Sequence, residues 1–221
     1  MDLKEAMAAR HSVRQYKDIP LLPEAVAALE AEVEACNREG GLHIQLVRDE
    51  PRAFDGFLAH YGKFSGVKNY FALVGKKGPD LEEKCGYYGQ RLVLKAQQMG
   101  LNTCWVALSY SKVKTAFVVD SGEKLCVVIA LGYGKTQGVP HRSKGPEEVA
   151  PAVGTAPRWF QDGVETALLA PTAMNRQKFT LIPEGDKVTA RAGGSLYAKL
   201  DLGIVKYQFE LGAGRENFHW A

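Results

Sequence analysis

The stretch "DLEEKCGYYGQRLVLKAQQMGLNTCWVAL", Asp80 to Leu108, carries the clearest information about the fold class. Its first part predicts a long helix, because Leu92 and Ala96 lie one helical turn apart and Gly100 ends the pattern. The apolar run "NTCWVAL" (102–108) that follows favours a strand. A helix that leads directly into an apolar strand indicates an α+β fold in which helices cover a sheet.

Further helices and strands are expected on both sides of this stretch. Asp2 can cap a first helix. Pro23 suits the first turn of a second helix, which Gly40 and Gly41 end. The predicted helices cover 3–10, 23–40, 52–61 and 80–100, and the predicted strands cover 42–49, 70–75, 102–108 and 124–134. The whole pattern predicts a mixed sheet covered by helices.

A connection rich in glycine and proline, "GKTQGVPHRSKGPEEVAPAVGTAP" (134–157), marks the best boundary within the chain. We therefore expect a first half over 1–150 and a second half over 151–221 that packs with it as one unit. The order of elements recurs after the boundary. The parallel segments are 22–47 with 157–182, and 86–105 with 200–220. They predict an internal duplication, a single-chain pseudo-dimer, with convergence of unrelated helix–strand pairs as the alternative.

Composition narrows the class of protein without naming a partner. The 221 residues are 46% hydrophobic, which suits one ordinary domain or two small ones. No apolar run approaches the ~20 residues that cross a bilayer, and the N-terminus lacks the apolar core of a secretory signal. We therefore expect a cytoplasmic protein that does not bind a membrane. A net charge of +3, spread along the chain, does not indicate nucleic-acid binding.

Several common site motifs are absent or fail on spacing. The stretch "GYGKT" ends like a phosphate loop, but the required first glycine would fall at Ile129. Read as G-x-G-x-x-G, it places Gln137 where the third glycine belongs. Neither a G-x-S-x-G hydrolase motif nor a His–Cys cluster with metal-ligand spacing occurs. We expect no metal site, and the four cysteines lack the C-x-x-C pairs of a zinc site.

Positive charge gathers in "AARHSVRQY" (8–16), at the end of the first predicted helix. Arg10, His11 and Arg14 are joined there by the hydroxyl of Ser12. One interpretation is a solvated helix end, since cations are favoured at helix C-termini. The other is a bound phosphate, because guanidinium groups hold phosphates through paired, charge-assisted hydrogen bonds.

Two amides and several small residues gather in "LLAPTAMNRQKF" (168–179). Asn175 and Gln177 offer donors and acceptors, and Ala170 and Ala173 allow a flat ligand to approach closely. From residue types alone, a helix-to-strand turn with surface amides remains the alternative.

Taken together, "RHSVRQY", "APTAMNRQ", "LNTCWV" and "PHRSKGPEEV" resemble motifs of the FMN-dependent nitroreductase superfamily. In that superfamily an R-x-S-x-R segment grips the flavin phosphate and an A-P-S-x-x-N-x-Q segment lies along the ring. In common members the second segment follows the first long helix, whereas here it lies in the second half. This order resembles the putative-nitroreductase subfamily, in which two related halves lie in one chain. Such a chain is expected to supply both sides of one flavin site.

The resemblance implies a nitroreductase-like fold with FMN as cofactor, and it assigns residues to the flavin. One group of these residues would contact the flavin phosphate, and another would contact the flavin ring. No protein side chain is assigned a catalytic role, because flavin N5 does the chemistry. The implied cofactor-binding residues are Arg10, His11, Ser12, Arg14, Val106, Ala107, Leu108, Arg142, Lys144, Pro171, Thr172, Ala173, Asn175 and Gln177.

The implied activity is hydride transfer from NAD(P)H to FMN, followed by reduction of a nitroaromatic, a quinone or a similar small aromatic acceptor. Without a Rossmann fingerprint the nicotinamide would share one pocket with the acceptor, so ping-pong kinetics are expected. The alternatives are another flavin reaction such as reductive dehalogenation, a flavin-binding protein without turnover, or a basic module that binds a different phosphorylated ligand. Monomer and homodimer both remain open.

Overall fold

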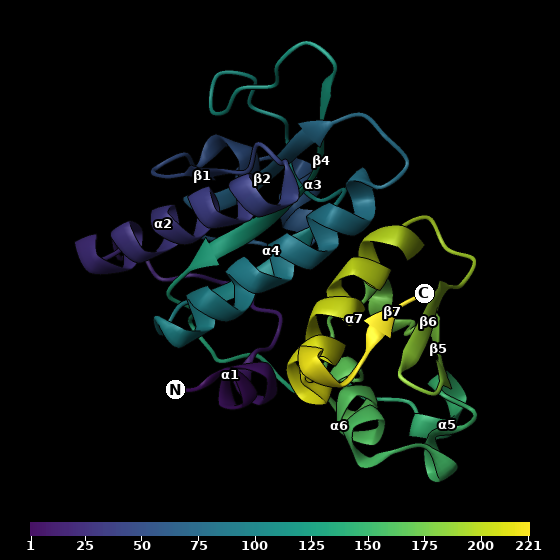
Figure 1. Cartoon of the computed structure of the whole chain (residues 1–221). Helices are drawn as coiled ribbons and strands as arrows, with labels where there is room; N and C mark the ends of the chain where they lie inside the picture. The colour runs from purple at the N-terminus through teal and green to yellow at the C-terminus, as the bar shows by residue number, and fades with distance from the viewer. The chain divides into compact units, whose positions relative to one another are not determined.

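The computed structural model describes residues 1–221, which separate into two compact units. The first, here called the central unit, comprises 9–81 and 91–140. The second, here called the C-terminal unit, comprises 1–8, 82–90 and 141–221. Figure 1 shows the elements of both units along the chain. Each unit has its own sheet and its own helices, and each is described by itself.

The sheet of the central unit has four antiparallel strands in the order β1-β2-β4-β3. Their bounds are β1 Gln45–Val47, β2 Asn69–Lys76, β3 Asn102–Val106 and β4 Glu123–Gly132. Phe71 of β2 and Trp105 of β3 both lie opposite Ile129 of β4. The two inner strands consist largely of buried apolar residues, so they form the core of this unit.

Helix α2 (Pro23–Gly40) and the second part of α4 (Leu81–Gln98) lie side by side over this sheet (Figure 1). Arg91 of α4 links the two helices, because its guanidinium binds Glu32 and lies 2.7 Å from Glu39 of α2. Gly41 ends α2 with a φ of 61°, a left-handed conformation that favours glycine. Two short elements, the 3₁₀ turn Arg52–Phe54 and α3 (Phe57–Tyr61), complete the unit.

The C-terminal unit contains a smaller three-stranded sheet in the order β5-β6-β7. Its strands are β5 Phe179–Glu184, β6 Lys187–Ala192 and β7 His219–Trp220, and its helices are α5 Pro146–Val149, α6 Arg158–Ala167 and α7 Ala198–Ala213. The first turns of α4 and most of α1 (Leu3–Ala9) also belong to this unit. Phe160 of α6 meets Phe209 of α7 edge to face, with 5.5 Å between ring centroids. This contact joins the two helices through buried aromatic rings.

The α+β class with a nitroreductase-like fold is confirmed, and most helix bounds agree with the sequence patterns. The four strands of the central sheet pair antiparallel, and the parallel pair of strands is β6 with β7. Asp2 caps α1 as predicted, since its carboxylate accepts the N–H of Glu5 at 2.8 Å. Helix α2 ends at the predicted glycines. The two compact units are not continuous in the sequence, since one of them combines 1–8 and 82–90 with 141–221. The division into halves over 1–150 and 151–221 stays a prediction.

Strand β1 is shorter than the predicted 42–49 for a local reason. The side chain of Asn37 occupies both backbone polar groups of Ile44, at 2.9 Å and 2.7 Å. Ile44 therefore cannot join the ladder to β2, and regular pairing begins only at Gln45. The predicted helix 52–61 is divided because Gly56 adopts an extended conformation before α3.

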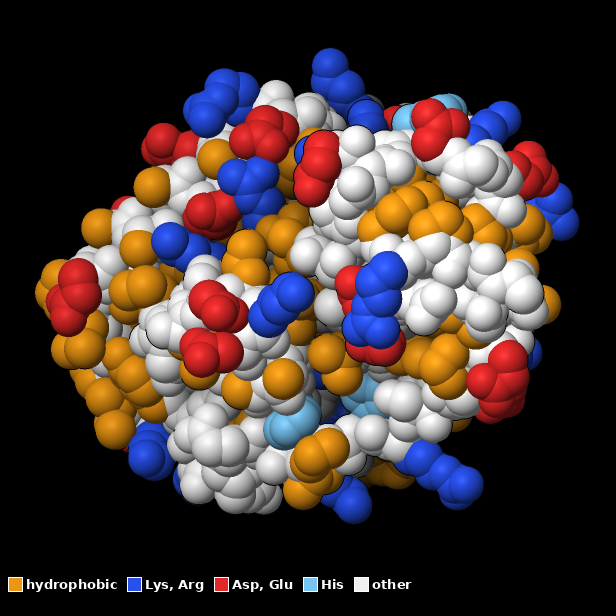
Figure 2. Space-filling model, turned by 60° about the horizontal axis from the view of Figure 1, so that its bottom comes forward, with side chains coloured by type: hydrophobic (Ala, Val, Ile, Leu, Met, Phe, Trp, Pro, Cys, Tyr) orange, Lys and Arg blue, Asp and Glu red, His pale blue; other side chains and the backbone are white.

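None of the helices combines the length and the apolarity that a bilayer crossing requires. On the face in Figure 2, Lys and Arg side chains are interspersed with Asp, Glu and apolar side chains. This mixture agrees with the modest net charge of +3.

Candidate functional site

The central unit contains a cleft of about 390 Å³ beside the end of β3. Three segments form its walls: the chain after α1, the end of α3 with its following loop, and the end of β3. The lining residues are Arg14, Tyr61, Gly62, Lys63, Phe64, Trp105, Val106, Ala107 and Ser109. Ligand pockets in proteins occupy ~300–1,000 Å³, so the cleft lies at the lower end of that range.

Backbone pairing holds the segment after α1 against β3. The N–H of Val13 donates to the carbonyl of Thr103 at 3.0 Å, and Ser12 forms a parallel bridge with the same residue. Further along, Ser65 donates to the carbonyl of Arg14 at 3.0 Å. These hydrogen bonds fix Arg14 at one wall of the cleft, where its guanidinium lies 6.0 Å from the ring centroid of Phe64.

Arg10 is a buried cation, with only 4% of its surface exposed. Its Nε is buried and has no hydrogen-bond partner. Burial lowers the pKa of this guanidinium to about 10, although the nearby Cys104 opposes that shift. An open, desolvated donor of this kind favours an anion, because charge-assisted hydrogen bonds are strong where water is excluded.

Cys104 of β3 lies close to the segment that carries Arg10, Ser12 and Arg14. Its pKa is raised by burial, while Arg14, the hydroxyl of Ser12 and Arg10 act in the opposite direction. The thiol therefore stays protonated. A neutral thiol does not compensate the positive charges of Arg10 and Arg14.

Only some of the central-unit residues that were predicted to contact the flavin ring line the cleft. Val106 and Ala107 line it, whereas Leu108 is not among the lining residues and is 70% exposed. His11 packs instead near Gly138, whose φ of 75° and lack of a Cβ allow the approach. The cleft thus contains three of the seven residues that the resemblance assigned to this unit: Arg14, Val106 and Ala107.

The C-terminal unit contains the other assigned segment, which follows α6 in an unusual backbone conformation. Met174, Asn175 and Gln177 have positive φ angles of 54°, 52° and 46°. The hydroxyl of Thr172 accepts the N–H of Gln177 at 3.0 Å. The N–H of Ala173 donates to Oδ1 of Asp201 at 2.9 Å. These hydrogen bonds stabilise a conformation that is uncommon outside glycine.

The two predicted amides hold the neighbouring segment 142–144. Gln177 accepts the N–H of Lys144 at 2.8 Å and donates to the carbonyl of Arg142 at 3.2 Å. Asn175 donates to the same carbonyl at 2.8 Å. In addition, Lys144 Nζ donates to the carbonyl of Gln177 at 3.1 Å. The structure thus brings these four predicted residues together, with Pro171, Thr172 and Ala173 next to them in the chain.

Tyr61, Lys63, Phe64 and Ser109 line the cleft but were not among the predicted site residues. Neither Tyr61 nor Lys63 belongs to one of the motifs described in the sequence. Lys63 adopts a φ of 63°, which its residue type does not indicate. The only sequence signal was the glycine at position 62, where a Cβ would lie 2.6 Å from Cβ of Ser109.

Comparison with known proteins places the chain among the nitroreductases. The family model described as "Putative TM nitroreductase" matches residues 2–213. A putative nitroreductase from Thermotoga maritima has a similar structure, with a TM-score of 0.67 and 21% identity over 96% of this chain and 83% of that one. No curated protein matches this chain.

Two further solved structures match a smaller part of the chain. A putative nitroreductase from Desulfovibrio desulfuricans, solved in complex with FMN, has a TM-score of 0.53 and 21% identity over 67% of this chain and 95% of that one. A putative NADH dehydrogenase/NAD(P)H nitroreductase from Bacteroides thetaiotaomicron has a TM-score of 0.51 and 17% identity over 66% and 95%. At these identities the likenesses establish the fold.

Proposed function

The chain belongs to the Putative TM nitroreductase family, and on that premise we propose that it is an FMN-dependent oxidoreductase. It takes a hydride from NAD(P)H and passes two electrons to a small acceptor such as a nitroaromatic or a quinone. The observation that carries this proposal is the buried Nε of Arg10, which has no partner, four residues before the cleft-lining Arg14.

The central unit has features that suit FMN. The phosphate of FMN is an anion, and Arg10 and Arg14 supply two guanidinium groups for it, with a hydroxyl from Ser12. The cleft of about 390 Å³ is walled by Tyr61, Phe64 and Trp105, which suit a flat aromatic ring. The fold relative from Desulfovibrio desulfuricans was solved in complex with FMN, which supports the choice of this flavin.

We assign a task to the residues that line the cleft and to Arg10 and Ser12, which precede the cleft-lining Arg14 in the chain. Arg10, Ser12 and Arg14 bind the phosphate. The backbone of Val106 and Ala107 would orient the ring, and the buried Phe64 and half-buried Trp105 would shield it from water. These residues would hold FMN, which would supply the redox chemistry of hydride acceptance and two-electron release. The chain therefore needs no nucleophile of its own, in agreement with the absence of a hydrolase motif.

The remaining residues that the resemblance assigned to FMN stay a proposal. They are His11, Leu108, Arg142, Lys144, Pro171, Thr172, Ala173, Asn175 and Gln177. Lys144 and Arg142 supply further positive charge, and the short side chains at 171–173 allow close approach of a ring. The internal duplication, a cytoplasmic location, and the monomer or homodimer as assembly also remain proposals.

The proposed reaction balances in two halves. NAD(P)H loses one hydride, which carries two electrons and one proton, and leaves as NAD(P)⁺. The acceptor then gains two electrons and takes the protons that it needs from the hydride and from water. Because both substrates use one cleft in turn, initial-rate plots should give parallel lines.

Absorbance spectroscopy tests the cofactor and the first half-reaction together. The purified full chain, reconstituted with FMN, is measured before and after anaerobic addition of NADPH or NADH. We expect flavin bands that bleach on addition. Bound flavin that does not bleach would favour a flavin-binding protein without turnover. Failure to bind FMN would contradict the proposal.

Screening of acceptors then separates the reactions of this fold. Steady oxidation of NAD(P)H with nitroaromatics or quinones supports the proposed class. Turnover only with a halogenated substrate, with release of halide, would instead identify reductive dehalogenation.

A further inference from the structure

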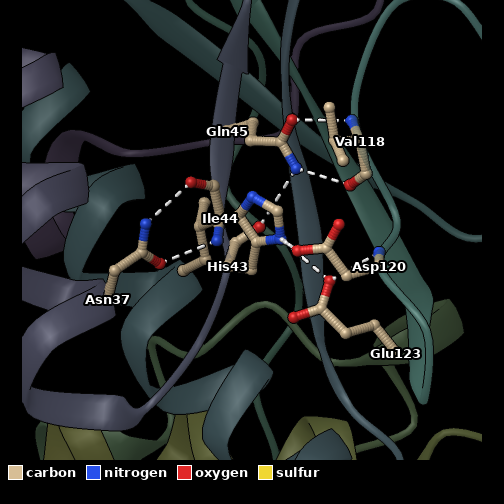
Figure 3. Close-up of polar contacts among 7 residues, drawn as sticks. All are labelled: Asn37, His43, Ile44, Gln45, Val118, Asp120 and Glu123. Atoms are coloured by element: carbon tan, nitrogen blue, oxygen red, sulfur yellow. Dashed lines mark hydrogen bonds and ion pairs between the residues drawn. The ribbon is translucent and has the colours of Figure 1, made fainter.

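Three side chains that can bind metal meet in the central unit (Figure 3), and none of them is among the residues that line the cleft. Nδ1 of His43 lies 2.8 Å from Oε2 of Glu123 and 3.8 Å from Oδ2 of Asp120. All three ligand atoms lie within 4.8 Å of one another. His43 precedes β1, whereas Glu123 is the first residue of β4 and Asp120 lies three residues before it, so the fold brings together residues far apart in the sequence.

Backbone contacts on both sides hold these groups in place. The N–H of His43 donates to the carbonyl of Val74 at 2.8 Å. The side chain of Gln45 pairs with Val118 in both directions, with a distance of 2.8 Å for each hydrogen bond (Figure 3). The segment that carries His43 is therefore joined to the segment that leads to Asp120 and does not depend on the cluster itself for its position.

The two carboxylates of the cluster differ in their exposure to solvent. The side chain of Glu123 is only 10% exposed, whereas Asp120 is 68% exposed. Oε2 of Glu123 accepts a hydrogen bond from the N–H of Asp120 at 3.0 Å and lies 2.8 Å from Nδ1 of His43. Its Oε2 therefore faces the imidazole nitrogen and is placed to act as a ligand.

We propose that His43, Asp120 and Glu123 bind one divalent transition-metal ion of the zinc type. One imidazole nitrogen and two carboxylate oxygens match the ligands of Zn²⁺, whereas Mg²⁺ and Ca²⁺ prefer oxygen alone. Ligand atoms ~2.0–2.2 Å from an ion lie at most about 4.4 Å apart. The two measured distances from Nδ1 satisfy that limit, and the exposed carboxylate of Asp120 is free to rotate into place.

Binding replaces the hydrogen bond between His43 and Glu123 with two bonds to the metal. The ligating Nδ1 must be without a proton, so the neutral imidazole binds as the tautomer that carries its hydrogen on Nε2. The remaining coordination positions are filled by water, since the protein supplies three ligands.

The consequence concerns the connection between β3 and β4, which covers 107–122. Its first residues include Ala107 and Ser109, which line the cleft, and its last residues include Asp120. A metal at this cluster ties the far end of the connection to the segment before β1. We therefore assign the site a structural task, the stabilisation of the loop that forms one cleft wall, and it does not depend on the proposed reaction.

Calorimetric titration of the full, chelator-treated chain with Zn²⁺ tests the proposal without any activity measurement. The chain should bind one ion. H43Q and D120N should each weaken binding by about 10-fold or more. H60Q and D55N remove a histidine and an exposed aspartate of the same unit outside the cluster, and they should bind as the unmodified chain does.

Asp120 is exposed, so D120N should fold even if a change at Glu123 does not. Circular dichroism in chelator checks the fold of every variant. Titration with Co²⁺ adds a spectroscopic readout, because a nitrogen and oxygen site gives no thiolate charge-transfer band. Undiminished Zn²⁺ binding by H43Q and D120N, no binding by the unmodified chain, or a thiolate band would each overturn the proposal.

Discussion

Oδ1 of Asp201, on α7, accepts the backbone N–H of Ala173 at 2.9 Å. The carboxyl group is buried, with 4% of the residue exposed, and burial raises its pKa to about 6. The hydrogen bond from Ala173 opposes this shift but does not cancel it. A buried acid thus supports the backbone of the segment that contains two of the predicted amides.

This acid makes stability depend on pH. Between pH ~4 and ~6 the folded chain holds the Asp201 proton that the unfolded chain has already lost. The free energy of unfolding should therefore fall as pH rises through this window, by up to about 3 kcal/mol at ~1.4 kcal/mol per pKa unit. D201N keeps an acceptor oxygen for Ala173 and removes the charge, so it should abolish this part of the slope. Urea unfolding at pH 4 and pH 7 checks the difference.

The control is D186N, because the side chain of Asp186 is 80% exposed. It should retain the slope of the unmodified chain. Equal slopes for D201N and the unmodified chain would show that Asp201 titrates normally.

Gly203 of α7 and Gly86 of α4 allow two helices of the C-terminal unit to approach closely. A Cβ at Gly203 would collide with the backbone carbonyl of Glu83, and one at Gly86 with that of Leu200. Because backbone cannot rotate away as a side chain can, G203A should destabilise this unit by about 2–3 kcal/mol. Thermal unfolding measures the loss. G194A, where a Cβ would meet nothing within 4 Å, should be nearly neutral.

Local patterns in the sequence predicted the elements of the fold well. Asp2, Pro23 and Gly41 mark helix ends through short-range capping and backbone preferences, which residue types reveal directly. The short strands β6 and β7 were not predicted. β7 has two residues and owes its existence to parallel pairing with β6, a partner that no local pattern indicates.

The candidate site was predictable only where a motif lies in one segment. Arg14 and Val106 come from such motifs, and both line the cleft. Tyr61 and Ser109 become neighbours of these residues through folding. The same holds for His43 and Glu123, which are separated by most of the central unit in the sequence and meet at 2.8 Å. Contacts over such separations depend on strand order, which spacing alone does not give.

A substitution at Gln177 tests whether this amide stabilises the fold in the absence of flavin. Its side chain contacts Arg142, Lys144 and Asn175, and only 1% of the residue is exposed. Q177A removes the acceptor of the part-buried Lys144 N–H and one of the two donors to the Arg142 carbonyl, so it should destabilise the chain by about 1–2 kcal/mol. Urea unfolding without flavin measures this loss. N175A, at a more exposed amide with fewer hydrogen bonds, should lose less.

A substitution at Arg10 should change the affinity of the chain for FMN without lowering the stability of the flavin-free chain. The buried guanidinium has an Nε without a partner, so R10M removes a desolvated charge and keeps an unbranched side chain. We expect the free energy of unfolding without flavin to stay equal or to rise by about 1 kcal/mol. The Kd for FMN should rise by about 10-fold to 100-fold, since a charge-assisted hydrogen bond contributes ~1.5–3 kcal/mol. Fluorescence titration with FMN, beside urea unfolding of the flavin-free chain, measures both quantities.

K17M removes an exposed cation of the same unit and should change neither. If R10M instead destabilises the flavin-free chain and binds FMN as tightly as the unmodified chain, Arg10 is a structural residue and the phosphate is bound elsewhere.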